Sequence, residues 1–139
     1  MTEIKIRESQ ISDYNDIRAL LNDAKLFNQS ITREAFKSML KRNEGFYLVA
    51  EVEGRIVGSV FATHDGAYFG YIYKLAVDKN HRRFGVATKL VAEIIGRFKS
   101  EDLHFIFIRV NRTNKKSQEF FKSFQFRSIG GNMMDLVLR

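Results

Sequence analysis

Apolar residues recur at three- and four-residue intervals in four stretches of the chain, which is the spacing of amphipathic helices. The first stretch follows Ser12 or Asp13, either of which can act as an N-cap, and the second follows Thr32. The third stretch covers residues 85–99 and the fourth covers 115–123. The positions expected to be buried in these helices are Ile17, Leu20, Leu21 and Ala24; Ala35, Phe36, Met39 and Leu40; Val86, Leu90, Val91, Ile94, Ile95 and Phe98; and Phe120, Phe121 and Phe124.

Between the helices, short runs of apolar and β-branched residues predict strands. The expected strands cover residues 4–6, 46–52, 55–63, 68–77, 103–110, 126–129 and 133–138. Glu53-Gly54 suits a hairpin turn and His64-Asp65-Gly66 suits the next turn, which predicts an antiparallel meander of three strands. The run LHFIFIRV at 103–110 is apolar at most positions, which predicts a strand buried on both faces.

This order of elements predicts an α+β fold with a three-layer α/β arrangement. We expect a mixed, mostly antiparallel sheet of about six to seven strands, flanked by about four helices. No linker, internal repeat or low-complexity tract interrupts the pattern, so residues 1–139 are expected to form a single domain.

Composition narrows the chemistry that the chain can carry. Hydrophobic residues make up 45% and charged residues 28%, which are ordinary values for a globular protein. There is no cysteine, which excludes disulfides and thiolate catalysis, and the three histidines lie too far apart in sequence to suggest a zinc site. The N-terminal residues lack a signal core, and no apolar run reaches the roughly 20 residues that span a membrane. We therefore expect a cytoplasmic protein without a membrane partner or a metal.

The chain is basic, with a net charge of +7 and a pI near 9.8. Such a charge suits nucleic acid or a polyanionic cofactor equally well. The basic residues are spread along the chain, with the densest groups at 79–83 and 109–116. Because no recognition-helix pattern or ribonucleoprotein motif accompanies them, the sequence does not favour a nucleic-acid partner.

The strongest local signal lies between the strand that ends at Val77 and the following helix. The residues Arg82-Arg83-Phe84-Gly85-Val86-Ala87 read as R-x-x-G-x-A and lead directly into that helix. The first N–H groups of a helix have no helical partners, and the helix dipole makes this end attractive to anions. Gly85 would let a phosphate approach the backbone closely. The segment therefore predicts a phosphate site, and the alternative is an ordinary helix start after a basic turn.

Three motifs follow one another along the chain. They are LVAEVEGRIVG at 48–58; LAV at 75–77 followed by RRFGVA at 82–87; and NRTN at 111–114 followed by SQEFFKSFQF at 117–126. In these motifs and in element order, from Ile4 to Leu138, the chain resembles the GNAT superfamily of N-acetyltransferases. The segment DGAYFGYIYKLAV at 65–77 is similar to that of small, single-domain bacterial and archaeal members.

The resemblance implies acetyl-CoA as the cofactor. The backbone of Leu75, Ala76 and Val77 would pair with the pantetheine arm, where this strand diverges from the strand at 103–110. The other implied cofactor-binding residues are Arg82, Arg83, Phe84, Gly85, Val86, Ala87 and Thr88 at the pyrophosphate, Asn114, and Phe121 at the thioester. Asn114 suits a helix N-cap equally well, and the two roles are compatible.

The chain departs from the family at the usual proton-handling residues. Phe121 stands where the family often has the tyrosine that protonates coenzyme A, and Tyr71 stands where many members carry a glutamate base. Gln125-Phe126 replaces the usual Gly-Phe pair. The backbone N–H of Val77 is the implied oxyanion donor.

The remaining candidates for proton transfer are Tyr71, Tyr73, His64 and Asp65. Each has a simpler structural interpretation. The two tyrosines alternate on one strand face and suit packing. His64 suits a solvated strand end, and Asp65 suits a turn.

The resemblance therefore implies an acetyl-CoA-dependent N-acetyltransferase that modifies a primary amine of a small molecule, peptide or protein. The missing tyrosine and glutamate leave open a non-catalytic acyl-CoA-binding or regulatory module. Substrate selection would fall to the two N-terminal helices, the loop at 27–30 and the last hairpin. Strand edges in a mixed sheet also allow a homodimer.

Overall fold

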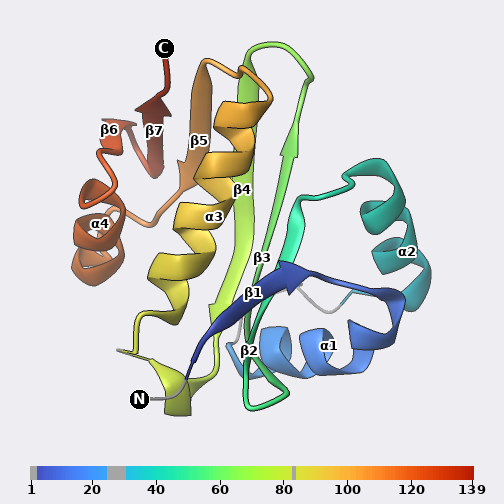
Figure 1. The fold of residues 1–139 in the computed structure, drawn as a ribbon. Coiled ribbons are helices and arrows are strands. Elements are labelled where there is room, and N and C mark those ends of the chain that lie inside the picture. Colours follow the sequence, from blue (N-terminus) through green and yellow to red (C-terminus); the bar gives the residue numbers. More distant parts are fainter. Residues whose placement is uncertain (1–2, 25–30, 83) are drawn as a thin grey trace.

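The computed structural model describes residues 3–24, 31–82 and 84–139, and in these residues a seven-stranded sheet is flanked by helices (Figure 1). The strands are β1 (Lys5–Glu8), β2 (Tyr47–Val52), β3 (Arg55–His64), β4 (Phe69–Val77), β5 (Phe105–Arg109), β6 (Arg127–Gly130) and β7 (Met133–Val137). The α-helices are α1 (Tyr14–Asp23), α2 (Arg33–Arg42), α3 (Val86–Ser100) and α4 (Lys115–Lys122). Two 3-10 turns, η1 (Ile11–Asp13) and η2 (Lys79–His81), precede α1 and α3. The predicted fold class is confirmed.

The sheet has the order β1-β2-β3-β4-β5-β7-β6. All neighbouring strands are antiparallel except β4 and β5, which run parallel because α3 connects them across the sheet. The predicted meander of β2, β3 and β4 is confirmed.

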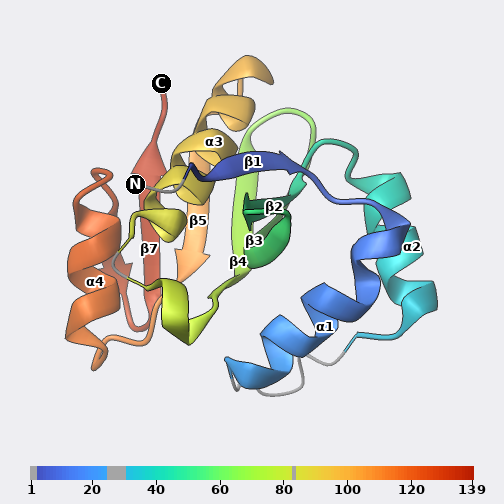
Figure 2. The same ribbon diagram turned by 60° about the horizontal axis from the view of Figure 1, so that its bottom comes forward.

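Helices cover both faces of the sheet, so that the molecule has three layers. In Figures 1 and 2, α1 and α2 lie together on one side and α3 and α4 on the other. The apolar stripe of α3 packs on β2, β3, β4 and β5 in the larger core cluster. A smaller cluster lies under α1 and α2, where Tyr47, Val49 and Phe61 of β2 and β3 meet Ile17 and Phe36.

Helix α3 lies unusually close to the sheet because two glycines face it. A Cβ built on Gly70 would lie 2.4 Å from Cε1 of Phe98, and a Cβ on Gly58 would lie 2.7 Å from Cγ1 of Val86. Real side-chain atoms do not approach so closely, so both glycines make room for α3. All six predicted positions of its stripe are buried.

Several burial predictions are wrong, among them those for Ala24, Met39 and Leu40, which are only half-buried. Strand β5 is buried on the α3 face only, because α1 and α2 cover β2, β3 and β4, and the other side of β5 leaves Phe105 and Phe107 half-exposed. On α2, Ala35 is exposed. On α4, Phe121 is buried, but Phe120 and Phe124 are half-buried because this short helix lies at one end of the sheet.

Side chains cap the starts of helices α2 and α4. Thr32 Oγ1 accepts a hydrogen bond from Ala35 N at 3.0 Å, and Asn114 Oδ1 accepts one from Ser117 N at 3.1 Å. The predicted caps at Thr32 and Asn114 are confirmed, whereas Asp13 stands at the N-cap of α1 without a side-chain capping hydrogen bond. Gln125, where the family has glycine, is in the left-handed region at φ 77°, which explains why a glycine suits this position.

An ion-pair network ties the N-terminal strand to the rest of the domain. Arg7 donates to both carboxylate oxygens of Asp13, at 2.8 and 2.9 Å, and to Glu51 at 2.9 Å. Asp13 Oδ2 also accepts from Gln10 N at 2.7 Å. Burial opposes ionisation of Asp13, but these hydrogen bonds together hold its pKa below its ordinary value.

Candidate functional site

A wedge opens in the sheet between β4 and β5. Their pairing runs from Phe69 opposite Phe105 to Ile72 opposite Ile108 and then stops. Strand β4 continues to Val77 and remains paired with β3 on its other side. The edge of β4 from residue 73 to 77 is therefore open towards β5.

A bulge in β4 marks the point where the strands separate. The register with β3 shifts between Ser59 and Phe61, and Lys74 on β4 has a φ of 57°. Further along, Asp78 N donates to Val57 O on β3 at 2.8 Å. Because backbone N–H groups alternate between the two edges of a strand, the N–H of Val77 points towards the wedge.

Five of the residues predicted for the site meet in the wedge. A cavity of about 290 Å³ lies there, and its lining includes Tyr71, Tyr73, Leu75, Asn114 and Phe121. They come from β4, from the N-cap of α4 and from α4 itself. The fold thus brings the predicted thioester and proton-transfer positions into one hollow.

The predicted phosphate loop forms a second hollow at the start of α3. A cavity of about 220 Å³ is lined by six of the predicted residues, Val77, Arg82, Gly85, Val86, Ala87 and Thr88, together with His81 and Phe120. Gly85 is the N-cap of α3, with a φ of 83°, and a Cβ built on it would meet no atom within 4 Å. The backbone here is thus approachable, and the unpaired N–H groups of the first turn of α3 suit an anion.

Two of the predicted cofactor residues that the structure describes, Ala76 and Phe84, line neither cavity. The side chain of Ala76 is buried beneath α1 and α2, so only its backbone can serve the wedge. Phe84 is 69% exposed. Arg83 lies outside the described residues, as does the loop at 27–30 that was expected to help select the substrate.

The two tyrosines of the wedge are neighbours on β4. Their ring centroids lie 5.5 Å apart, which confirms that Tyr71 and Tyr73 share a strand face. Burial, followed by the neighbouring Tyr71, raises the pKa of Tyr73 above its ordinary value. Tyr73 therefore keeps its proton at neutral pH and is suited to donate it.

The structure gives His64 and Asp65 structural roles away from the wedge. The ring of His64 packs against Phe46 and Phe98 on the α3 face, with centroid distances of 4.9 and 6.3 Å. Asp65 Oδ1 accepts from three backbone N–H groups of its turn, at 2.8 to 3.0 Å. These hydrogen bonds hold the pKa of Asp65 below its ordinary value. The turn interpretation of Asp65 is confirmed.

Sequence reasoning missed two cationic residues of the wedge. Lys74 and Arg109 line the same cavity as the tyrosines. The Nζ of Lys74 lies 5.8 Å from the centroid of the Tyr73 ring, and burial lowers the pKa of Lys74. The sequence does carry a signal for Arg109, because it is the only arginine, lysine or carboxylate residue in the apolar run LHFIFIRV.

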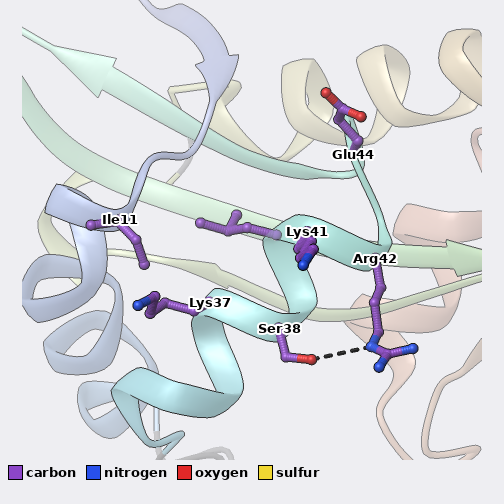
Figure 3. A pocket seen from close by; sticks show the side chains of 7 residues that line it. Ile11, Lys37, Ser38, Lys41, Arg42 and Glu44 are labelled. Atoms are coloured by element: carbon purple, nitrogen blue, oxygen red, sulfur yellow. Dashed lines mark hydrogen bonds between the residues drawn. The ribbon is translucent and has the colours of Figure 1, made fainter.

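A more voluminous hollow than these two lies elsewhere, along α2 (Figure 3). It measures about 880 Å³ and is lined mainly by long surface side chains such as Lys37, Lys41 and Arg42. An exposed hydrogen bond of 3.3 Å joins Arg42 to Ser38 there. None of the predicted site residues lines this hollow, so its size does not make it the functional site.

Residues 3–24, 31–82 and 84–139 contain neither a candidate metal cluster nor a helix suited to crossing a membrane. Within them, His, Asp and Glu side chains form no group of three or more that could hold a metal ion. None of their helices combines the length and apolar character that a membrane crossing requires.

Comparison with known proteins points to one family. The model of the acetyltransferase (GNAT) family matches residues 11–126. An acetyltransferase of Photorhabdus laumondii is 29% identical over 92 residues, which is 66% of this chain and 64% of that protein. An uncharacterized N-acetyltransferase of Methanocaldococcus jannaschii is 29% identical over 109 residues, 71% of this chain and 69% of the relative. The first match thus spans less than two thirds of its relative's length.

Solved structures share the fold at lower identity. Ard1 from Thermoplasma volcanium has a TM-score of 0.86 at 18% identity, with 98% of both chains covered. The structure of yncA from Salmonella typhimurium with its cofactor acetyl-CoA has a TM-score of 0.82 at 19% identity, covering 99% of this chain and 95% of that one. Arabidopsis thaliana Naa50 in complex with the bisubstrate analogue CoA-Ac-MVNAL has a TM-score of 0.79 at 16% identity, covering 97% and 99%.

Proposed function

The chain belongs to the acetyltransferase (GNAT) family, and from that premise we propose that it is an N-acetyltransferase that moves an acetyl group from acetyl-CoA to a primary amine. The observation that carries the proposal is the succession of two hollows along β4, one at the wedge and one at the start of α3. The acceptor is a small molecule, peptide or protein.

Acetyl-CoA is the cofactor, and the residues of the two hollows fit its parts. The first turn of α3, with Gly85 at its N-cap and Arg82 beside it, holds the pyrophosphate. The open backbone edge at Leu75 and Val77 pairs with the pantetheine amides. Asn114, at the N-cap of α4, lies beside the arm, and Phe121 lies at the acetyl end.

When bound, acetyl-CoA supplies a thioester whose carbonyl carbon can accept an amine. The residues of the wedge hold the two reactants together, and the N–H of Val77 stabilises the negative charge that develops on the carbonyl oxygen. Tyr73 would donate the proton that the departing sulfur takes up when the C–N bond forms and the C–S bond breaks. The proton lost by the amine leaves through Tyr71 or water.

A second candidate function rests on what the described lining of the wedge lacks. Phe121 cannot donate a proton, and no carboxylate lines the cavity within the described residues. Both features favour a module that binds an acyl-CoA without transferring the acyl group. If the protein is instead the proposed enzyme, it works without a carboxylate base.

Incubation with acetyl-CoA and a panel of amines distinguishes the two functions. The panel should contain polyamines, free amino acids and peptides with a free N-terminus, with thiol release followed as a function of time and the acetylated product identified by mass. Amine-dependent product formation supports the enzyme. Saturable acetyl-CoA binding without any product would overturn it in favour of the binding module.

A further inference from the structure

The mouth of the wedge opens on the sheet face that α1 and α2 partly cover. The β4–β5 register aligns Tyr71 with Phe107, and Phe61 on β3 aligns with Tyr73. Phe61 belongs to the cluster under α1 and α2. Because side chains two residues apart share a strand face, Arg109 points to the same side as Phe107.

The proposed cofactor contacts come from the other face. Helix α4 joins the core cluster of α3 through Phe121, and the phosphate loop leads into α3. The acceptor amine therefore reaches the wedge from the side of Tyr71, Tyr73 and Arg109. The charges on that side act directly on the acceptor.

These charges are positive. Arg109 is exposed and forms no ion pair with the described residues, and Lys74 lines the same cavity. The nearest carboxylate in this row of the sheet is Asp135 on β7, opposite Phe107. Its side chain is only 7% exposed and accepts a 2.8 Å hydrogen bond from Arg127. The carboxylate of Asp135 is thus paired with Arg127, and the mouth presents the cation of Arg109 to an entering acceptor.

Building on the proposed function, we infer that the preferred acceptor is an amine that carries a carboxylate within a few atoms of the amino group. Arg109 attracts that carboxylate while the amine lies at the thioester, which orients the acceptor. Polyamines and lysine-rich segments bring a second positive charge to the same place and are selected against. The carboxylate is either the α-carboxylate of a free amino acid or an acidic side chain next to a peptide N-terminus.

Matched acceptors test this inference and distinguish the two sources. One arm compares alanine with alanine amide, and the other compares peptides that begin Ala-Glu, Ala-Gln and Ala-Lys and are otherwise identical. We expect kcat/KM to be about tenfold higher for the acidic member of a pair, which is the effect of one partly exposed charge pair. The arm that shows the difference identifies the source. Equal kcat/KM values in both arms, or a preference for lysine, would overturn the inference.

Reversing the charge of Arg109 should raise the activity towards one of the peptides, and a misfolded variant could not show such an increase. In Arg109→Glu the preference should invert, so that the Ala-Lys peptide gains activity while the Ala-Glu peptide loses it. The matched control is Lys99→Glu, which changes the net charge by the same amount. Lys99 is exposed and lies near the C-terminal end of α3. The control should keep the original preference, and an unchanged preference in Arg109→Glu would contradict the role of this arginine.

Binding of CoA-acetyl-peptide conjugates separates this inference from the proposed function. The wild-type chain should bind the Ala-Glu conjugate about tenfold more tightly than the Ala-Lys conjugate by calorimetry. If no free acceptor is acetylated, the proposed function fails, and the ratio of these two affinities still decides the inference. Equal affinities overturn it, even if transfer occurs.

Discussion

Two tyrosines of β4 line the wedge, and no glutamate lines it among the described residues. Phe121 occupies the place of the family's usual acid, and its ring lines the same cavity as Tyr71 and Tyr73. Burial keeps the Tyr73 phenol protonated, which suits an acid and not a base. At the scale of single residues, proton transfer should therefore depend on hydroxyls of β4.

Tyr73→Phe should lower kcat by roughly 10- to 100-fold and leave the Kd for acetyl-CoA nearly unchanged, because it removes a proton donor and little volume. Tyr71→Phe should have a similar but smaller effect. Since the pKa of Tyr73 is raised, the wild-type rate should not fall from loss of its proton until the pH exceeds about 10. Phe121→Tyr is the control and should leave the rate unchanged or raise it. Full turnover in both phenylalanine variants would mean that water supplies the proton.

The Arg7–Asp13 pair makes the free energy of unfolding depend on pH. The folded pKa of Asp13 is lower than its unfolded value, so its stabilisation is fully present above about pH 4 and is lost as the pH falls through the folded pKa. Asp13→Asn should lower the free energy of unfolding by about 2 kcal/mol at pH 7, and the difference should shrink at pH 3 and below.

Urea unfolding at pH 7 and at pH 2 measures this difference. Glu44→Gln, at an exposed position after α2, is the matched control and should have little effect at either pH. A loss in Asp13→Asn that is equally large at pH 2 would show that the carboxylate charge does not contribute.

At the scale of elements, the start of α3 combines a left-handed glycine with an open backbone. Gly85→Glu should weaken acetyl-CoA binding by at least about 100-fold, because the side chain enters the phosphate hollow and its carboxylate repels the phosphates. Calorimetric titration with acetyl-CoA gives the Kd.

Gly66→Glu is a matched control for backbone strain. Gly66 has a φ of 80° and, like Gly85, no atom within 4 Å of its Cβ position, but it lies in the β3–β4 turn. Both variants should lose similar stability, and only Gly85→Glu should lose binding. Wild-type affinity in a folded Gly85→Glu protein would place the phosphates elsewhere.

The close approach of α3 to the sheet predicts opposite effects at two glycines. Gly70→Ala should lower the free energy of unfolding by about 1–3 kcal/mol, because the buried ring of Phe98 occupies the space that a Cβ needs. Gly96→Ala on the exposed side of α3 meets no atom within 4 Å and should add about 0.5–1 kcal/mol. Denaturant unfolding of both variants provides the measurement. An unchanged free energy of unfolding in Gly70→Ala would mean that α3 can move away from the sheet without loss of stability.

The sequence predicted the helices and strands better than it predicted which of their faces are buried. The helical stripe of α3 is a local pattern, and all six positions are buried as expected. Whether β5 is covered on its second face depends on where α1 and α2 lie, and the run LHFIFIRV does not contain that information. The roles of Lys74 and Arg109 depend on the β4 bulge and the β4–β5 register, which arise from pairing between segments distant in the chain.

At the scale of the whole molecule, a net charge of +7 suits a polyanionic ligand. Acetyl-CoA at about 100 times its Kd should stabilise the fold by roughly 2.7 kcal/mol and raise the Tm by on the order of 10 °C. A thermal-shift titration tests this, with generic duplex DNA as the control that should give no comparable shift. An unchanged Tm at millimolar acetyl-CoA would argue against the cofactor.

The wedge also bears on how this chain avoids aggregation. An unpaired strand edge at the rim of a sheet invites pairing with a strand of another molecule. Here the open edge of β4 lies inside the sheet, between β3 and β5 and beside α4, where another chain cannot align with it. The two rims are formed by β1 and β6, each only four residues long, and charged residues occupy both. The protein thus keeps a strand edge of β4 open for its ligand, and strands of other protein molecules cannot pair with that edge.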